Sequence, residues 1–243
     1  MRKDTLAVRG SSAVRRVLEA ELVAVRERGD VRPRVIDVGG GSGVWAVPLA
    51  AEGCEVTVVE PNPNAIATLQ RRAEEEGVSD RITVIADDTD ALAEQIPAGS
   101  ADLVLAHGVL EVVDDPGSVI AALASVVSPA GAISVLVANR HAAVFHRALT
   151  GKVDEARHLL ADPDGVLPEE RDVLLRRFDT AGLRALLEGA GLTLSVLQGE
   201  GVVWDPMSDT GDADLADFEL EAAQIPALRD IASRLHAVAR RSG

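Results

Sequence analysis

The chain has 243 residues, a formal net charge of −15 at neutral pH, and 47% hydrophobic residues. So many apolar residues permit a sizeable core and exclude global disorder. The acidic balance argues against a broad electrostatic footprint on nucleic acid or an anionic membrane, and an aromatic content of 2% leaves few side chains for stacking on bases.

The single cysteine and the N-terminal segment bear on redox chemistry and location. Cys54, alone, excludes an intramolecular disulfide and any multi-cysteine metal site, and we expect no bound metal. The first ten residues, MRKDTLAVRG, lack the apolar core of a signal peptide, and no apolar run reaches the roughly 18 residues that a membrane-spanning helix needs. These observations predict a cytoplasmic protein without a membrane partner.

Hydrophobic periodicity predicts a helix over 12–28, followed by alternating strands and helices. The expected strands are 34–38, 55–59, 82–86, 101–106 and 132–138. The helices expected between them are 44–51, 62–76, 90–95 and 117–127. Such alternation is typical of βαβ crossovers, and it predicts an α/β fold with a mostly parallel sheet that has helices on both faces.

The regular alternation ends after residue 138. Short helical stretches are expected at 141–149 and 153–160, followed by a proline- and acid-rich connection over 161–168. The remaining expected elements are a helix at 178–189, a strand at 192–197, a loop at 199–211 and an acidic helix at 212–224. The last segment, 225–241, is helical on periodicity alone, with a seventh strand at its end as the competing interpretation.

A glycine-rich turn follows the first expected strand. Asp37 stands at the end of that strand, and Gly39, Gly41 and Gly43 come after it. Glycines here let the backbone approach a ligand closely, and the helix that follows favours polar or anionic groups at its N-terminus. Gly41-x-Gly43-x-x-Ala46 formally fits the dinucleotide pattern, so an NAD-dependent oxidoreductase is one hypothesis. In a dinucleotide site, however, the first glycine normally closes the turn directly after the strand.

An acid also closes the second expected strand. Glu60, followed by Pro61, comes about 20 residues after the glycine turn, which suits bidentate hydrogen bonding to ribose hydroxyls. Dinucleotide sites use an acid at this point, and so do other sites for a nucleoside cofactor. Glu60 therefore supports a nucleoside cofactor without choosing which kind.

An acid at the strand end followed by G-x-G-x-G resembles motif I of the class I S-adenosylmethionine (SAM)-dependent methyltransferases. The resemblance implies that Asp37 anchors the methionine amino group of SAM and that the glycine turn runs along the amino-acid and ribose portions. The acidic turn 87–90 resembles the position whose carboxylate takes the adenine amino group. Asp88 is the preferred match and Asp87 the second, with the backbone N–H of the next residue, Thr89, at the adenine ring.

Residues 102–116, DLVLAHGVLEVVDDP, look like the fourth strand and following loop of the same family. Within them HGVLE at 107–111, together with NRH at 139–141, is similar to the bacterial tRNA 5-carboxymethoxyuridine methyltransferases, whose patterns are H-x-V-L-E and N-x-H. The chain departs from that family at Val112, Ala138 and Val203, where the family has two aromatic residues and an arginine. Those are the groups expected to stack on an anionic base and to hold it.

Taken together, the resemblance predicts one Rossmann-like methyltransferase domain over 1–243 with a seven-stranded sheet. Its expected parts are the helix 12–28, a SAM-binding core over 34–138, a helical insertion on the substrate side over 139–178 and the C-terminal part of the sheet over 179–243. The sequence leaves open the oligomeric state and the role of residues 1–10.

The expected activity is SAM-dependent methyl transfer to an oxygen or nitrogen atom of a small molecule. The alternatives are esterification of a tRNA wobble uridine, a SAM-binding module without turnover, and the NAD-dependent oxidoreductase. A carboxylate acceptor needs no general base, whereas a hydroxyl or amine needs one, and His141 or His107 is suited to that role. Asn139 completes the candidate catalytic set, and His107 is also a cofactor-binding candidate through its backbone.

Overall fold

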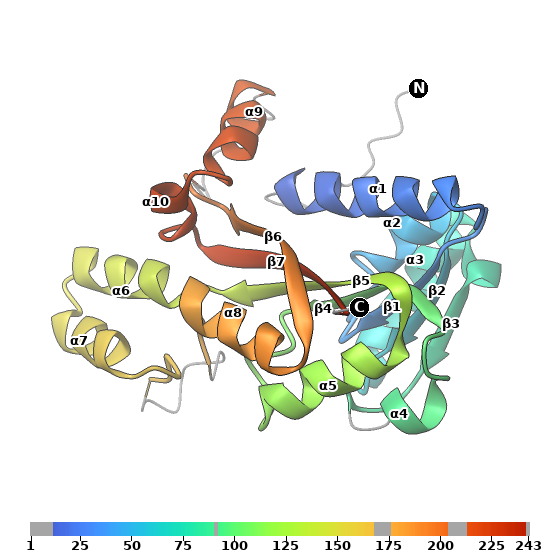
Figure 1. The fold of residues 1–243 in the computed structure, drawn as a ribbon, viewed down its shortest axis with the longest axis horizontal. Helices are drawn as coiled ribbons and strands as arrows, with labels where there is room; N and C mark the ends of the chain where they lie inside the picture. The colour runs from blue at the N-terminus through green and yellow to red at the C-terminus, as the bar shows by residue number, and fades with distance from the viewer. Residues whose placement is uncertain (1–11, 90–91, 168–175, 204–212, 242–243) are drawn as a thin grey trace.

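The computed structural model describes residues 12–89, 92–167, 176–203 and 213–241, and a seven-stranded sheet runs through the middle of the molecule (Figure 1). The strand order is β3-β2-β1-β4-β5-β7-β6. The strands are β1 (Arg34–Val38), β2 (Glu55–Val59), β3 (Ile82–Ile85), β4 (Ala101–His107), β5 (Val127–Ala138), β6 (Leu192–Glu200) and β7 (Arg234–Arg241).

The register of the sheet brings the ends of three strands to one edge. β1 pairs in parallel with β2 and β4, and Val38 lies opposite Val59 on one side and Ala106 on the other. The residues that follow β1 and β2, and the last residue of β4, therefore emerge side by side. In open α/β sheets this carboxyl edge is where ligands bind.

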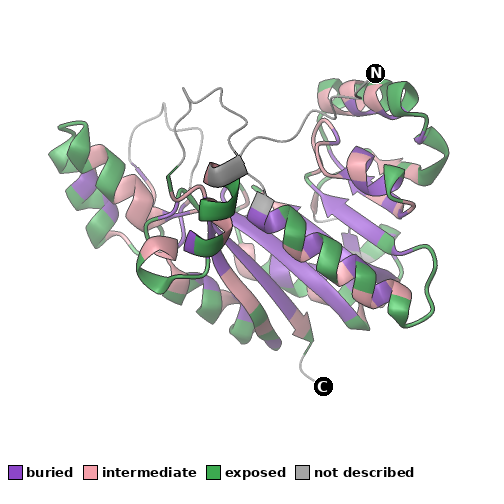
Figure 2. Cartoon of the chain, turned by 90° about the horizontal axis from the view of Figure 1, so that it is seen from above, coloured by how far each residue is buried: buried purple, intermediate pink, exposed green. Residues whose placement is uncertain are grey.

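Helices cover both faces of the sheet. One face packs against α1 (Ser12–Glu27), α2 (Ala46–Ala51) and α3 (Pro63–Glu76), and the other against α4 (Leu92–Gln95), α5 (Pro116–Val126) and α8 (Thr180–Gly189). The central strands are buried almost along their whole length because they lie between these layers (Figure 2). The core is aliphatic, as the low aromatic content requires.

The remaining helices lie beyond the end of β5. A pair of helices, α6 (Arg140–Leu149) and α7 (Val153–Ala161), directly follows β5 and projects from the body of the molecule (Figure 1). Near β6 and β7 lie α9 (Ala213–Ala222) and α10 (Pro226–Arg229), and a 3-10 turn at Ser79–Arg81 precedes β3. No helix in the described ranges is long and apolar enough to cross a membrane.

The α/β fold with a mostly parallel sheet is confirmed, and the last segment ends as a strand rather than a helix. β7 is antiparallel to both β5 and β6 and lies between them. Its side chains alternate between the two faces: Leu235 and Ala237 pack with the α5 and α8 layer, and Val238 packs on the α1 layer. Because both faces are buried from Leu235 to Ala239, this stretch lacks the alternation of apolar and exposed polar residues that marks a half-buried strand, and its periodicity alone wrongly favoured a helix.

Candidate functional site

The glycine turn forms a tight cradle after β1. Gly39, Gly41 and Gly43 have φ angles of +65°, +55° and +76°, which L-residues with a side chain rarely adopt. The turn is closed by a hydrogen bond from the N–H of Gly43 to the carbonyl of Gly40 at 2.9 Å. The three predicted glycines are therefore suited to this turn, because a residue with a side chain would be strained at these φ angles.

Asp37 lies buried beneath this turn, with 1% of its surface exposed. One carboxylate oxygen, Oδ2, has no hydrogen-bond partner among the described residues, although the N–H of Ala46 bonds to the carboxyl group. Burial raises the pKa of Asp37 to about 7, and the negative charge of Glu60 adds to this effect. A buried acid with an unpaired oxygen is costly to the fold, and a bound cation would relieve that cost.

Glu60 is held by the glycine turn itself. Its Oε2 accepts a hydrogen bond from the N–H of Gly41 at 2.9 Å, and its Oε1 accepts one from the N–H of Asn62 at 2.8 Å. The side chain is oriented before any ligand arrives, and each oxygen keeps a further lone pair for a hydroxyl. Pro61 follows, and Asn62 caps α3.

The acidic turn after β3 is exposed, and its two described acids differ in their contacts. Asp87 accepts hydrogen bonds from the N–H of Asp88 and from the amide of Gln95, the latter at 2.6 Å. Among the described residues, Asp88 accepts only from Thr89, through its N–H at 2.6 Å and its hydroxyl at 3.2 Å. Asp90, the last residue of the motif, lies outside the described residues.

His107, the last residue of β4, belongs to a buried polar cluster. Its Nε2 lies 2.8 Å from the hydroxyl of Ser134, and its ring meets that of Trp45 edge-on with centroids 5.0 Å apart. Burial, together with the nearby ring of His236 and the charge of Arg234, lowers the pKa of His107 well below its usual value. The imidazole is therefore neutral near neutral pH.

Two buried glutamates and an arginine lie near the ends of β5 and β7. Glu111 belongs to the HGVLE pattern at 107–111, whereas Glu200 and Arg234 were not among the residues expected at the site. Glu111 accepts a hydrogen bond from the N–H of Ala138 at 2.8 Å, and burial raises its pKa. Burial and the charge of Glu219 raise the pKa of Glu200 to about 8. Arg234 offsets part of the shift at Glu111 and at Glu200. For Glu200, the signal available in the sequence was an acid at the end of a largely apolar run.

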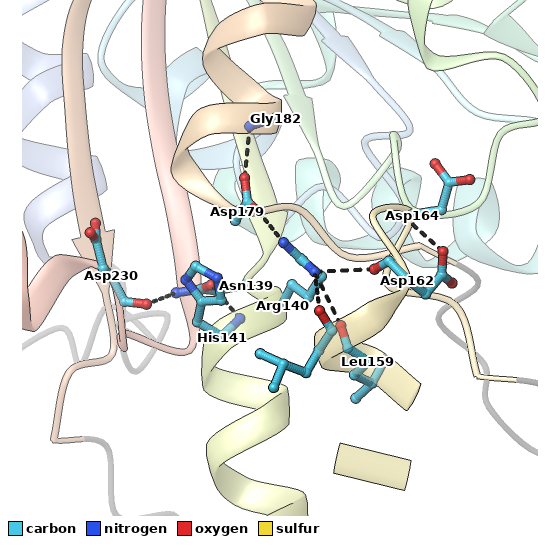
Figure 3. A network of polar contacts seen from close by, with 10 residues as sticks. Asn139, Arg140, His141, Leu159, Asp162, Asp164, Asp179, Gly182 and Asp230 are labelled. Atoms are coloured by element: carbon cyan, nitrogen blue, oxygen red, sulfur yellow. Dashed lines mark hydrogen bonds and ion pairs between the residues drawn. The ribbon is translucent and has the colours of Figure 1, made fainter. Parts of the chain in front are cut away.

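Asn139 and Arg140 join the helical pair to the rest of the molecule (Figure 3). The Asn139 side chain caps α6 by accepting from the N–H of His141 at 3.0 Å, and its amide donates to the carbonyls of Asp230 and Ala232. Arg140 pairs with Asp179, the N-cap of α8, and donates to three carbonyls at the end of α7.

The two histidines proposed as bases are in different networks. His141 is half-buried at the start of α6 and interacts electrostatically with Asp179. His107 contacts Ser134 and Trp45 instead, and no hydrogen bond between described residues joins the two histidines. No group of three potential metal ligands gathers anywhere in the part of the chain that the structure describes.

The departures from the tRNA-modifying family are exposed or at a strand end. Val112 and Val203 are each 51% exposed, and Ala138 ends β5.

Arg15, at the start of α1, pairs with Glu19 and Glu52. Residues 1–10 lie outside the described residues.

The sequence pattern of a methyltransferase-domain family matches residues 11–196. A tRNA 5-carboxymethoxyuridine methyltransferase of Escherichia coli strain K12 is 35% identical over 128 residues, which are 53% of this chain and 49% of that protein. A ubiquinone biosynthesis O-methyltransferase of Paracidovorax citrulli is 33% identical over 175 residues, 72% of this chain and 68% of that one. The match to the tRNA enzyme thus spans about half of that relative's length.

The fold is also shared with solved methyltransferase structures. Magnesium protoporphyrin IX methyltransferase from Synechocystis PCC 6803 was solved with bound S-adenosylhomocysteine (SAH). It superimposes with a TM-score of 0.60 at 16% identity, over 100% of this chain and 90% of that one. A SAM-dependent methyltransferase from Methanosarcina mazei superimposes with a TM-score of 0.61 at 15% identity, over 90% and 96% of the two chains.

Proposed function

The chain belongs to the class I SAM-dependent methyltransferases, and we propose that it transfers a methyl group from SAM to an oxygen or nitrogen atom of a small molecule. The observation that carries this proposal is the unpaired, buried Oδ2 of Asp37 beneath three glycines in the left-handed backbone conformation. A binding pocket that retains such a costly group needs a cation to meet it, and the methionine part of SAM supplies an ammonium group. The family match favours this activity over the NAD-dependent oxidoreductase.

The described residues offer a candidate partner for each part of the cofactor. We assign the ammonium group to Asp37 and the amino-acid and ribose portions to the turn that contains Gly39, Gly41 and Gly43. Glu60, with both oxygens already oriented by backbone N–H groups, is assigned to the ribose hydroxyls. Asp88 remains the preferred partner of the adenine amino group because Asp87 is engaged by the Gln95 amide.

SAM supplies a methyl group on a positively charged sulfur that is a good leaving group. The protein's own contribution is to bind and orient the reactants and to exclude water between them. For a hydroxyl or amine acceptor, His141 is the candidate general base because it stands at the start of α6, close to the carboxyl edge of β5. Asn139, whose amide is bonded to three backbone groups, is assigned to positioning this histidine.

Charge, contacts and similarity together support a small acceptor. The net charge of −15 disfavours the phosphate backbone of RNA, and the exposed Val112 and Val203 offer neither stacking nor a cation there. The P. citrulli relative, named for ubiquinone biosynthesis, matches 72% of this chain, against 53% for the tRNA enzyme. The tRNA wobble carboxylate is the second candidate. The E. coli relative, named for tRNA, is 35% identical to this chain, against 33% for the P. citrulli relative and 16% for the magnesium protoporphyrin IX methyltransferase.

The test is transfer of labelled methyl from SAM to an extract of the source cells that is fractionated into RNA, protein and small molecules. Label in the small-molecule fraction is expected. Label in tRNA would overturn the small-molecule assignment and establish the second candidate. Binding of SAH without transfer to any fraction would make the protein a SAM-binding module, and binding of NAD in place of SAH would overturn the methyltransferase activity itself. Asp37→Asn is the negative control.

A further inference from the structure

A continuous row of polar side chains crosses the sheet on its α1-facing side. The Ser134 hydroxyl of β5 lies 2.8 Å from Nε2 of His107 on β4 and 2.8 Å from Nε2 of His236 on β7. Nδ1 of His236 is 3.0 Å from the amide nitrogen of Gln198 on β6. The oxygen of that amide in turn accepts a hydrogen bond from the amide of Gln224 at 2.8 Å.

The donors and acceptors in this row have one consistent direction. The amide nitrogen of Gln198 can only donate, so Nδ1 of His236 accepts. A neutral imidazole has one N–H, and His236 therefore carries it on Nε2 and donates to Ser134. The single hydroxyl hydrogen of Ser134 is then directed to His107. As a result, Nε2 of His107 accepts and its proton is on Nδ1.

Both histidines are neutral, as this argument requires. Burial lowers the pKa of His236 to about 3, and it lowers the pKa of His107 well below the usual value. His236 is fully buried, with no exposed surface. The charged groups that influence His107 are His236, when protonated, and Arg234, and both oppose a positive charge on its ring.

The row ends in an unpaired donor beside the cofactor cradle. Nδ1 of His107 is buried and has no hydrogen-bond partner among the described residues. The ring stands edge-on to Trp45, which follows Gly43 by two residues and is the N-cap residue of α2. A buried N–H without a hydrogen-bond partner destabilises the fold, so its retention calls for a partner that arrives with a ligand.

We propose that this row holds His107 as the Nδ1–H tautomer, which donates a hydrogen bond to an oxygen of the bound molecule. His107 then acts as an orienting donor and not as a base, because Nε2 is occupied by Ser134 and Nδ1 already carries its proton. The inference rests on the proposed function for the ligand, which is either the cofactor or the methyl acceptor. The tautomers themselves are a property of the protein alone.

The test is NMR of protein with ¹⁵N-labelled histidine, recorded without ligand. Long-range proton–nitrogen correlations identify the protonated nitrogen of each ring, with His107→Gln and His236→Gln to assign the signals. We expect Nδ1–H for His107 and Nε2–H for His236. Ser134→Ala should convert His107 to a mixture of tautomers, whereas Ser195→Ala, which removes a hydroxyl bonded to the Val238 carbonyl, should leave His107 unchanged.

The outcomes separate this inference from the proposed function. A proton on Nε2 of His107, or a His107 spectrum that Ser134→Ala does not alter, overturns the tautomer assignment. Titration with SAH and with 5′-methylthioadenosine, which lacks the amino-acid part, then locates the accepting oxygen. If the His107 signals shift with SAH and not with 5′-methylthioadenosine, the oxygen belongs to the amino-acid part of the cofactor, and if they shift with both, it belongs to the nucleoside. If they shift only when the cell-extract fraction that becomes methylated is added, the oxygen belongs to the methyl acceptor. No shift with any of the three overturns the donor role, and failure of SAH to bind overturns the proposed function alone.

Discussion

Gly40 lies directly against the carboxylate of Asp37: a Cβ atom on residue 40 would stand 2.7 Å from Oδ2 of Asp37 and 2.8 Å from Cγ1 of Val58. The absence of a side chain at residue 40 is therefore what leaves room for the unpaired carboxylate oxygen. The pattern G-x-G-x-G contains Gly40 as a variable position, so the motif gave no reason to single it out.

Replacing Gly40 by alanine should weaken cofactor binding. The added methyl group must displace either the Asp37 carboxylate or Val58, at a cost of about 1–3 kcal/mol in stability. We expect SAH affinity, measured by calorimetry, to fall by about tenfold or more. Gly189→Ala is the matched control because, apart from its chain neighbours and its own helix backbone, no heavy atom of the described residues lies within 4 Å of its Cβ position. Equal SAH affinity of the Gly40 variant and the wild type would contradict the assignment of this turn.

Replacing Asp37 by asparagine should separate binding from stability. The change removes a buried carboxylate whose pKa burial raises to about 7, so at pH 8 the variant should unfold at a temperature no lower than the wild type. Its SAH affinity should drop by about tenfold or more, because a neutral amide does not attract the ammonium group as a carboxylate does. A variant that binds SAH as tightly as the wild type would remove Asp37 from the site.

Cofactor affinity should depend on pH through the same side chain. Below about pH 7 the free protein holds Asp37 protonated, and ionising it to meet a cation then costs free energy. Affinity for SAH should therefore rise about tenfold per pH unit up to about pH 7 and level off above it. Calorimetry between about pH 5.5 and 8.5 measures this profile, and Asp37→Asn should flatten it. A wild-type profile that is already flat would refute the link.

Glu200 should make the fold less stable as pH rises. Its carboxylate pKa is raised to about 8, so the folded state binds a proton more tightly than the unfolded chain does. The associated stability is fully present below the unfolded value of about 4.3, and it is lost as pH rises towards about 8. Glu200→Gln should reduce this loss in urea unfolding, whereas Glu76→Gln, at an exposed site on α3, should not. Identical pH dependence of the Glu200 variant and the wild type would contradict the shift.

Cys54 should be unreactive while the protein is folded. Its side chain is fully buried, and burial raises the thiol pKa to about 11, which leaves little thiolate near neutral pH. A colorimetric thiol reagent should react about a hundredfold more slowly with the native protein than with the protein in guanidinium chloride. Comparable reaction rates in the native and denatured protein would show that the core around Cys54, directly before β2, opens readily in the folded state.

The SAM-binding half of the molecule could be predicted closely from sequence. β1 and β2 have the expected bounds, 34–38 and 55–59, because each is a short β-branched run bounded by glycine or by charged residues. Glu60 follows β2 and the glycine turn follows β1, so parallel pairing alone brings both to one edge. Local chemistry was sufficient here because each functional residue adjoins the element that positions it.

The row of buried polar side chains from His107 to Gln224 depended on contacts between distant segments. Ser134 and His236 are 102 residues apart, and no local sequence pattern links them. Their pairing required β7 to lie antiparallel beside β5, which the run at 234–241 did not reveal because both of its faces are buried. The sequence by itself thus determined the family and the bounds of β1 and β2, and it supplied the candidate cofactor residues, since these follow from local patterns. Only the tertiary structure decided which buried polar groups share hydrogens, because a hydrogen-bond network depends on register between strands that sequence periodicity does not encode.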